Sequence, residues 1–139
     1  MNTRVPWDLY AAVAAGGAVG ALGRHLLVTA WPQPAGGFPW ATLVVNLTGC
    51  AAIGVLMATL AGLTAPHRWA RPFLGTGVLG GFTTFSAYAV EARALLEAGR
   101  AGVAATYVLV TLVGALAAVW LGMLVVRGVR RWRGGRGAG

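Results

Sequence analysis

The residues best suited to chemistry in this sequence lie in one apolar stretch, Gly75–Glu91. Its middle holds Gly80 and Gly81, followed by hydroxyl side chains that alternate with aromatic rings: Thr83, Thr84 and Ser86 with Phe82, Phe85 and Tyr88. Each glycine costs a helix about 1 kcal/mol relative to alanine. Helices interrupted at membrane depth expose backbone carbonyls and half-helix ends, which can bind ions. The stretch therefore predicts an ion site, although a kinked helix packed closely on a neighbour is the competing interpretation.

Other polar residues stand alone among apolar neighbours, and each has two interpretations. Asn46 could bond a neighbouring helix, or it could offer amide N–H donors to an anion without adding charge. Tyr107 and Thr111 share one helix face and predict either a packing seam or a hydroxyl-lined track. Arg24 could extend to the interface or could face a watery vestibule that attracts anions. Glu91 is the most deeply placed acid, and we expect it at the interface or in a vestibule.

The composition places these residues in a membrane. The chain has 139 residues, of which 58% are hydrophobic and 10% are charged, and a helix needs about 20 residues to cross a bilayer. The hydrophobic stretches predict an all-α membrane protein with a single domain over residues 1–139. Its four helices are expected at residues 6–31, 39–63, 70–98 and 101–126, and a basic tail is expected at 127–139.

Several other functions fit the sequence poorly. The chain has three acidic residues, no histidine cluster and no histidine base near Ser86, which disfavours an embedded enzyme. A small proton-coupled drug exporter needs a carboxylate inside its first helix, and here Asp8 lies at the edge of that helix. The arginines of the tail directly follow a membrane helix, so we expect them to meet anionic lipid rather than nucleic acid. The single cysteine, Cys50, excludes an intrachain disulfide.

Three motifs resemble those of the CrcB/Fluc family of fluoride channels. They are GGAVGALGR at Gly16–Arg24, TLVVNLTG at Thr42–Gly49 and GGFTTFSAYAVE at Gly80–Glu91. The resemblance implies a fluoride-specific channel that exports fluoride passively across the bacterial cell membrane. It further implies an antiparallel dimer of four-helix subunits, with helix three broken at its centre and two narrow pores along the subunit interface.

The resemblance also assigns roles to residues of this sequence. Asn46 matches the pore asparagine, and Phe85 and Tyr88 match a pair of pore-facing phenylalanines. Backbone carbonyls of Gly80 and Thr83 match the site of a structural sodium ion at the dimer interface. The remaining matches are a hydroxyl track, made of Thr84, Ser86, Tyr107 and Thr111, and two vestibule residues, Arg24 and Glu91. Tyr88 departs from the family pattern, because its hydroxyl adds bulk and a donor to the pore.

The arginines are unevenly distributed between the two ends of the predicted bundle. With four spans, both termini and the middle connection share one side, which holds Arg4, Arg68, Arg71 and the five tail arginines. The opposite side holds Arg24, Arg93 and Arg100. The positive-inside rule therefore predicts cytoplasmic N- and C-termini. A chain inserted one way could need a related subunit of opposite orientation, so the partner is expected to be either this chain itself or such a relative.

Overall fold

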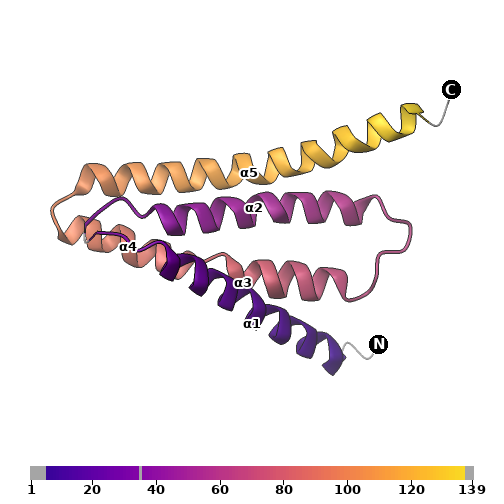
Figure 1. Cartoon of the computed structure of the whole chain (residues 1–139), viewed down its shortest axis with the longest axis horizontal. Helices are drawn as coiled ribbons and strands as arrows, with labels where there is room; N and C mark the ends of the chain where they lie inside the picture. Colours follow the sequence, from indigo (N-terminus) through magenta and orange to yellow (C-terminus); the bar gives the residue numbers. More distant parts are fainter. Residues whose placement is uncertain (1–5, 35, 137–139) are drawn as a thin grey trace, which may run out of the picture.

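The structure is a computed structural model and describes residues 6–34 and 36–136. Helices make up its regular elements, and these residues contain no strand (Figure 1). The elements are α1 (Trp7–Ala30), α2 (Trp40–Ala61), η1 (Ala70–Leu79), α3 (Gly80–Phe82), α4 (Phe85–Glu97) and α5 (Ala101–Arg136). Four segments are long and apolar enough to cross a membrane: Trp7–Ala30, Trp40–Ala61, Ala70–Glu97 and Ala101–Arg133. The predicted all-helical fold with four spans is confirmed.

The fourth helix differs from its expected length. We predicted its end at residue 126, but α5 continues to Arg136. Arginine is a good helix former, and no proline interrupts this segment, so the hydrophobic boundary does not end the helix. Arg130 Nη2 also donates to the carbonyl of Thr59 at 2.7 Å, which ties the extension to the end of α2. Most of the basic tail is therefore helical, while Arg4 and residues 137–139 lie outside the described residues.

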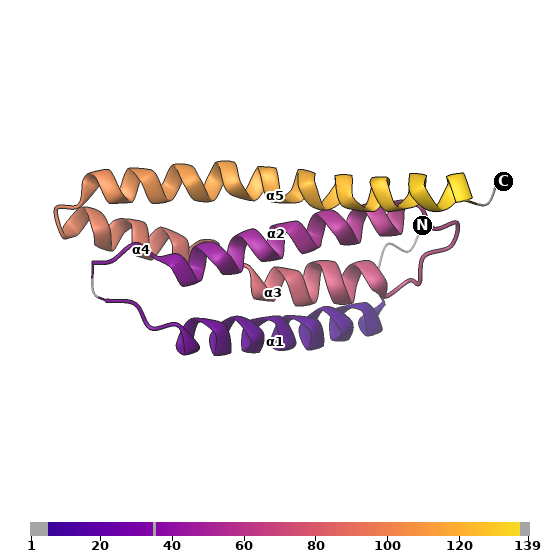
Figure 2. The ribbon, with the colours of Figure 1, turned by 45° about the horizontal axis from the view of Figure 1, so that its top comes forward.

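The third span changes neighbours along its length. Its first half, η1 and α3, packs on α1, whereas its second half, α4, packs on α5. The α2 helix lies beside α5 along most of its length, as Figures 1 and 2 both show. Within η1 the hydrogen bonds have the wider π-helical pattern, and the Gly80 N–H donates to the carbonyl of Gly75. The change of neighbour occurs at Thr83 and Thr84, which lie between α3 and α4.

Glycines allow the first half of the third span to approach α1. A Cβ atom at Gly20 would lie 2.0 Å from the Val78 carbonyl oxygen, and one at Gly16 would lie 2.4 Å from that of Phe73. Gly16 and Gly20 are four residues apart and form a GxxxG pair, a sequence pattern typical of close contact between membrane helices. Gly80 and Gly81 belong to the helical turn α3, so the glycine pair itself is not where the helix ends. Gly81 instead allows close contact, because a Cβ there would lie 2.4 Å from the carbonyl oxygen of Gly17.

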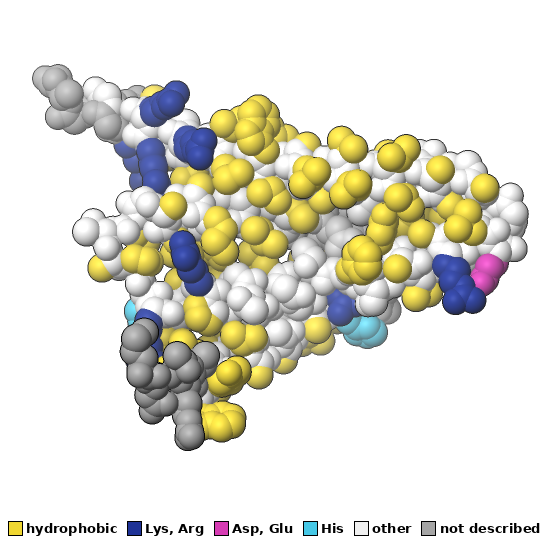
Figure 3. Space-filling view, turned by 180° about the vertical axis from the view of Figure 1, so that it is seen from behind, with side chains coloured by type: hydrophobic (Ala, Val, Ile, Leu, Met, Phe, Trp, Pro, Cys, Tyr) yellow, Lys and Arg dark blue, Asp and Glu magenta, His cyan; other side chains and the backbone are white. Residues whose placement is uncertain are grey.

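Charge is concentrated at the two ends of the molecule. Both ends of the described chain and the connection between α2 and η1 lie at one end of the bundle, and the other two connections lie at the opposite end (Figure 1). Several arginine side chains gather at the end where the chain terminates, while hydrophobic side chains cover the length between the ends (Figure 3). This distribution is typical of a membrane protein whose two ends face different aqueous compartments.

Candidate functional site

The site is built on two extended residues in the third span. Thr83 has φ −73° and ψ 155°, and Thr84 has φ −144° and ψ 121°, so neither continues the helix. Asn46, from the middle of α2, pairs with the backbone of Thr84 in both directions. Its Nδ2 donates to the Thr84 carbonyl at 3.0 Å, and its Oδ1 accepts from the Thr84 N–H at 2.8 Å. Asn46 therefore satisfies backbone groups that would be costly to leave unpaired in a membrane.

The interruption releases two carbonyl groups from helical bonding. In a continuous helix the Gly80 carbonyl would accept from the N–H of Thr84, but that N–H donates to Asn46. The Thr83 carbonyl would accept from the N–H of Ala87, which donates instead to the Thr84 hydroxyl at 3.2 Å. Unwound carbonyls at the C-terminal end of a half-helix are typical Na⁺ ligands. The carbonyl oxygens of Gly80 and Thr83 are the type of ligand that a small hard cation prefers.

The start of α4 has the opposite polarity. Thr84 is its N-cap residue, and the Thr84 hydroxyl also lies 3.3 Å from the Ser86 hydroxyl. The first turn of a helix carries partial positive charge and unpaired N–H groups, so it favours an anion. The two half-helix ends therefore place a cation-favouring and an anion-favouring region next to each other within one span.

A half-open groove lies beside Asn46, and we call it the Asn46 groove. It has a volume of about 260 Å³, and its predicted site residues are Asn46, Thr83, Thr84, Phe85, Tyr88 and Thr111. The Thr111 hydroxyl is buried and has no hydrogen-bond partner within the described part of the chain. One of the two N–H groups of Asn46 Nδ2 is used on Thr84, which leaves the other as a donor. The groove thus combines uncharged donors with the ring of Tyr88.

The aromatic pair differs in exposure. Phe85 is 79% exposed on the surface of the subunit, whereas Tyr88 is half-buried. The two ring centroids are 5.6 Å apart, and Tyr88 is also 5.3 Å from the ring of Tyr107. Aromatic pairs at such separations are favourable. Tyr88 is therefore held between α4 and α5, and Phe85 projects from the surface of the described chain.

Five predicted residues do not line the groove: Ser86 and Gly80, described above, and Tyr107, Arg24 and Glu91. The Tyr107 hydroxyl donates to Glu91 Oε2 at 2.7 Å, and the Tyr107 side chain is fully buried in the core. Arg24 Nε donates to the Gly81 carbonyl at 3.3 Å, so Arg24 contacts the end of α3. Glu91 lines a separate pocket of about 230 Å³ together with Gln33, Pro34, Gly36, Gly37 and Pro39. Arg24 and Glu91 therefore belong to different helix contacts.

Sequence reasoning missed the role of Thr42. Its hydroxyl donates to Glu91 Oε1 at 2.6 Å, so the carboxylate of Glu91 accepts bonds from both α2 and α5. Thr42 is only 2% exposed. The sequence feature that could have indicated this role is its position four residues before Asn46, which places both side chains on one face of α2. Thr42, Glu91 and Tyr107 form a polar contact between three helices that continues the polar face of α2 beyond Asn46.

Comparison with known proteins gives one consistent family. The family model described as CrcB-like protein, Camphor Resistance (CrcB), matches residues 11–123. The protein named fluoride-specific ion channel FluC 1 of Streptomyces coelicolor is 51% identical over 132 residues, which cover 95% of this chain and 84% of that protein. FluC 2 of Nocardia farcinica is 52% identical over 124 residues, covering 89% and 86% of the two chains. FluC of Agrobacterium fabrum is 44% identical over 119 residues, covering 84% and 94%. Because the family match runs from the first span into the last, this chain belongs to the CrcB family.

Proposed function

We propose that this chain forms a fluoride-specific ion channel, not an enzyme, and that it lets fluoride leave the cytoplasm passively and so reduces fluoride toxicity. The observation that carries the proposal is the Asn46 groove, where an amide held by the Thr84 backbone lies beside a buried, unpaired threonine hydroxyl. The names of the relatives, fluoride-specific ion channels at about half identity, support the same function.

The chemistry of the groove suits a small, strongly hydrated anion. A pore must replace the water around such an ion with hydrogen-bond donors, and Asn46 and Thr111 provide them without formal charge. Conduction also needs binding that is weak enough to let the ion leave. A lysine or arginine in the groove would bind fluoride more strongly, and the lining residues include neither. Neutral donors are therefore the better basis for selective but rapid passage.

The complete pore is proposed to require a second subunit in antiparallel orientation. The Asn46 groove is half open, Phe85 is largely exposed, and Gly80 is exposed beside it. A second copy of the chain, or a related subunit, would cover this face and turn each groove into a channel. In that dimer the interruption at Thr83 and Thr84 is the central break of helix three. The Gly80 and Thr83 carbonyls of both subunits would then share one structural sodium ion.

The orientation in the membrane follows from charge. The arginine-rich end of the bundle carries the termini, so we propose that it faces the cytoplasm of a bacterial cell. The connections from α1 to α2 and from α4 to α5 would then face outward. The Asn46 groove lies beside Thr83 and Thr84, near the centre of the third span, so an ion that crosses the membrane would have to pass along this groove.

Fluoride efflux from liposomes tests the proposal, with chloride efflux as the selectivity control. The purified protein should release fluoride but not chloride. Asn46→Asp should abolish fluoride release, because its carboxylate repels the anion and cannot donate to the Thr84 carbonyl. Thr48→Ala is the matched control on α2, since the Thr48 hydroxyl only bonds carbonyls of its own helix, and should leave flux unchanged. Undiminished flux in Asn46→Asp would place the ion path elsewhere, and no fluoride flux in the parent protein would refute the function.

A further inference from the structure

A second groove lies between the first half of α1 and the start of η1, and we call it the Ala15 groove. Its volume is about 550 Å³, and it shares no lining residue with the Asn46 groove. Volumes of about 300–1,000 Å³ are typical of sites that bind small molecules. The proposed ion pathway does not include this groove. The type of ligand that fits it therefore has to be inferred from the residues that line it.

The sequence explains why the groove exists. Asp8, Ala11, Ala12 and Ala15 follow one face of α1 at spacings of three and four residues, and all four line the groove. The helices α1 and η1 approach closely just beyond them, where a Cβ on Gly16 would lie 2.4 Å from the Phe73 carbonyl oxygen and 3.0 Å from the Gly77 Cα. Alanine side chains are too short to fill the space on the near side of that contact. The groove therefore results from short alanine side chains next to a close helix contact that glycines permit.

The walls of the groove are apolar and belong to membrane spans. Opposite the alanines, the groove is lined by Phe73 and Leu74 of η1 and by Trp69, which is 42% exposed. Both α1 and the span that begins with η1, Ala70–Glu97, are long and apolar enough to cross a bilayer. A tryptophan at the end of such a span is typical of the membrane–water interface. An apolar hollow that opens at this depth meets lipid tails rather than water.

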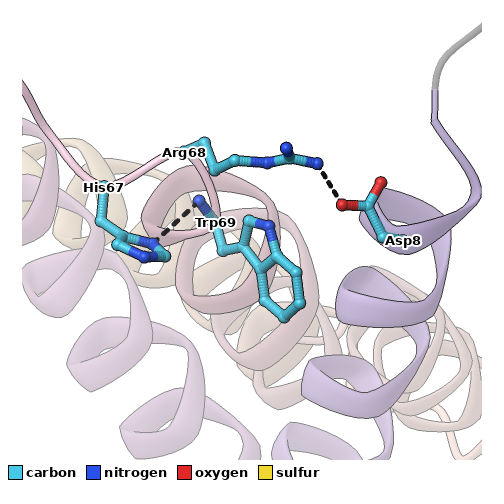
Figure 4. Close-up of polar contacts among 4 residues, drawn as sticks. All are labelled: Asp8, His67, Arg68 and Trp69. Atoms are coloured by element: carbon cyan, nitrogen blue, oxygen red, sulfur yellow. Dashed lines mark hydrogen bonds and ion pairs between the residues drawn. The ribbon is translucent and has the colours of Figure 1, made fainter.

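Polar groups border the groove at the end of the bundle that carries the termini (Figure 4). The Arg68 guanidinium pairs with the carboxylate of Asp8, and its remaining N–H groups are still donors. His67 Nδ1 accepts from the backbone N–H of Trp69 at 3.4 Å, which leaves Nε2 as the ring nitrogen that can contact a ligand. Arg71 follows one turn later and is exposed. Asp8 and His67 line the groove, whereas Arg68 and Arg71 do not. Because Arg68 is paired with Asp8, the net positive charge of these residues comes from Arg71.

We infer that the Ala15 groove binds an anionic phospholipid, with one acyl chain between α1 and η1 and the phosphate bonded by Arg68 and His67. Basic pockets between membrane helices bind anionic headgroups, and guanidinium groups match the geometry of phosphate oxygens. The apolar walls and the basic rim are continuous, so a molecule with a tail and a phosphate fits both at once. A second protein subunit would also cover the apolar walls, and contact of Trp69 with lipid separates the two occupants.

Quenching of Trp69 fluorescence by brominated lipids tests the inference. A variant keeps Trp69 and carries phenylalanine at the other five tryptophans, in liposomes with equal parts of phosphatidylglycerol and phosphatidylcholine. Either one lipid or the other carries bromine on its acyl chains. Brominated phosphatidylglycerol should quench Trp69 with about a fivefold preference, the ratio expected from one arginine near the membrane surface. A Trp120-only variant reports bulk lipid, because Trp120 is 58% exposed on α5, and should show no preference.

Substitutions separate the groove from its surroundings. Ala15→Leu fills the groove and should remove the preference, whereas Ala14→Leu, exposed on α1 outside the groove, should keep it. Arg68→Gln should reduce the preference while quenching by both lipids continues. Equal quenching of Trp69 by the two lipids would overturn the inference. Weaker quenching of Trp69 than of Trp120 by both lipids would also overturn it and would assign the groove to protein contact.

Native mass spectrometry of the unmodified protein gives a second measurement that does not depend on replacing tryptophans. Phosphatidylglycerol should remain bound more often than phosphatidylcholine when both are present at equal concentration. The difference should disappear in Ala15→Leu and persist in Ala14→Leu. Equal retention of both lipids by the parent protein would contradict the inference as directly as the fluorescence result.

Discussion

Asn46 can hydrogen-bond to two different partners through one side chain. It pairs with the backbone of Thr84 as a neighbouring strand would, and it still has one N–H group directed elsewhere. An apolar residue of the same size could not satisfy the Thr84 backbone, and a charged residue would change the field in the groove. The amide is therefore suited both to holding the interruption of the third span and to meeting an ion.

Tyr88 gives a prediction at this scale. Its ring contacts those of Phe85 and Tyr107, but no hydrogen bond of its hydroxyl occurs within the described residues. Tyr88→Phe keeps both ring contacts, so fluoride efflux and thermal stability should match the parent protein. Tyr88→Ala loses both contacts, each worth about 0.5–1.5 kcal/mol, and should lower the unfolding midpoint as well as the flux. Loss of fluoride flux in Tyr88→Phe would show that the hydroxyl itself meets the ion.

At the scale of the elements, the contact between α1 and the first half of the third span depends on missing side chains. Gly16, Gly20 and Gly81 each lie where a Cβ atom would overlap a carbonyl oxygen of the neighbouring helix. Helices in a membrane gain no hydrophobic benefit from association, so close backbone packing is a main source of their affinity. Replacing these glycines should therefore weaken the bundle without touching the Asn46 groove.

A pair of alanine substitutions tests the contact. Gly20→Ala places its methyl group 2.0 Å from the Val78 carbonyl oxygen, whereas a Cβ on Gly17 meets nothing within 4 Å. Overpacking of this kind costs about 1–3 kcal/mol, so Gly20→Ala should lower the thermal unfolding midpoint in detergent. Gly17→Ala should match or exceed the parent protein, because alanine favours helix. Equal midpoints for the two variants would show that the helices are not closely packed at Gly20.

The same elements show what sequence can and cannot predict. Hydropathy and length located four spans, because each must cross about 30 Å of hydrocarbon. The GxxxG contact was predictable from the helix period. The extended residues are Thr83 and Thr84 rather than the glycine pair, because Asn46 stabilises the extended backbone from another helix. A hydrogen bond between residues far apart in the chain leaves no pattern in the local sequence. The same holds for the bond between Thr42 and Glu91 and for the π-helical hydrogen bonds of η1.

At the scale of the whole molecule, the uneven distribution of arginine predicts a single orientation. Green fluorescent protein fused to the C-terminus should fluoresce in cells, and alkaline phosphatase fused there should be inactive, because the arginine-rich end stays in the cytoplasm. Replacing Arg127, Arg130, Arg131 and Arg133 by glutamine should raise the phosphatase signal. Equal activity of both reporters in the parent chain would show dual orientation and favour a dimer of this chain with itself.

Sodium removal tests the proposed complete assembly. If carbonyls of Gly80 and Thr83 from two subunits hold one ion, replacing Na⁺ by N-methylglucamine should lower the stability of the dimer and slow fluoride efflux. Returning Na⁺ should restore both, whereas Mg²⁺, which loses its hydration water reluctantly, should not. Identical dimer stability and flux in the two cations would argue against a structural sodium ion. Fluoride flux would then rest on the Asn46 groove alone.

The two extended residues between α3 and α4 also affect how the protein can change over evolution. One added residue in a continuous helix turns everything after it by about 100°, which would rotate a whole face away from its partner. Thr83 and Thr84 have no helical register to transmit, so the two halves of the third span are oriented independently, one by α1 and the other by α5. A change of register in η1 would disturb its own glycine contacts with α1, but Phe85 and Tyr88 would keep their direction. The non-helical link therefore uncouples the helical register of one half from that of the other.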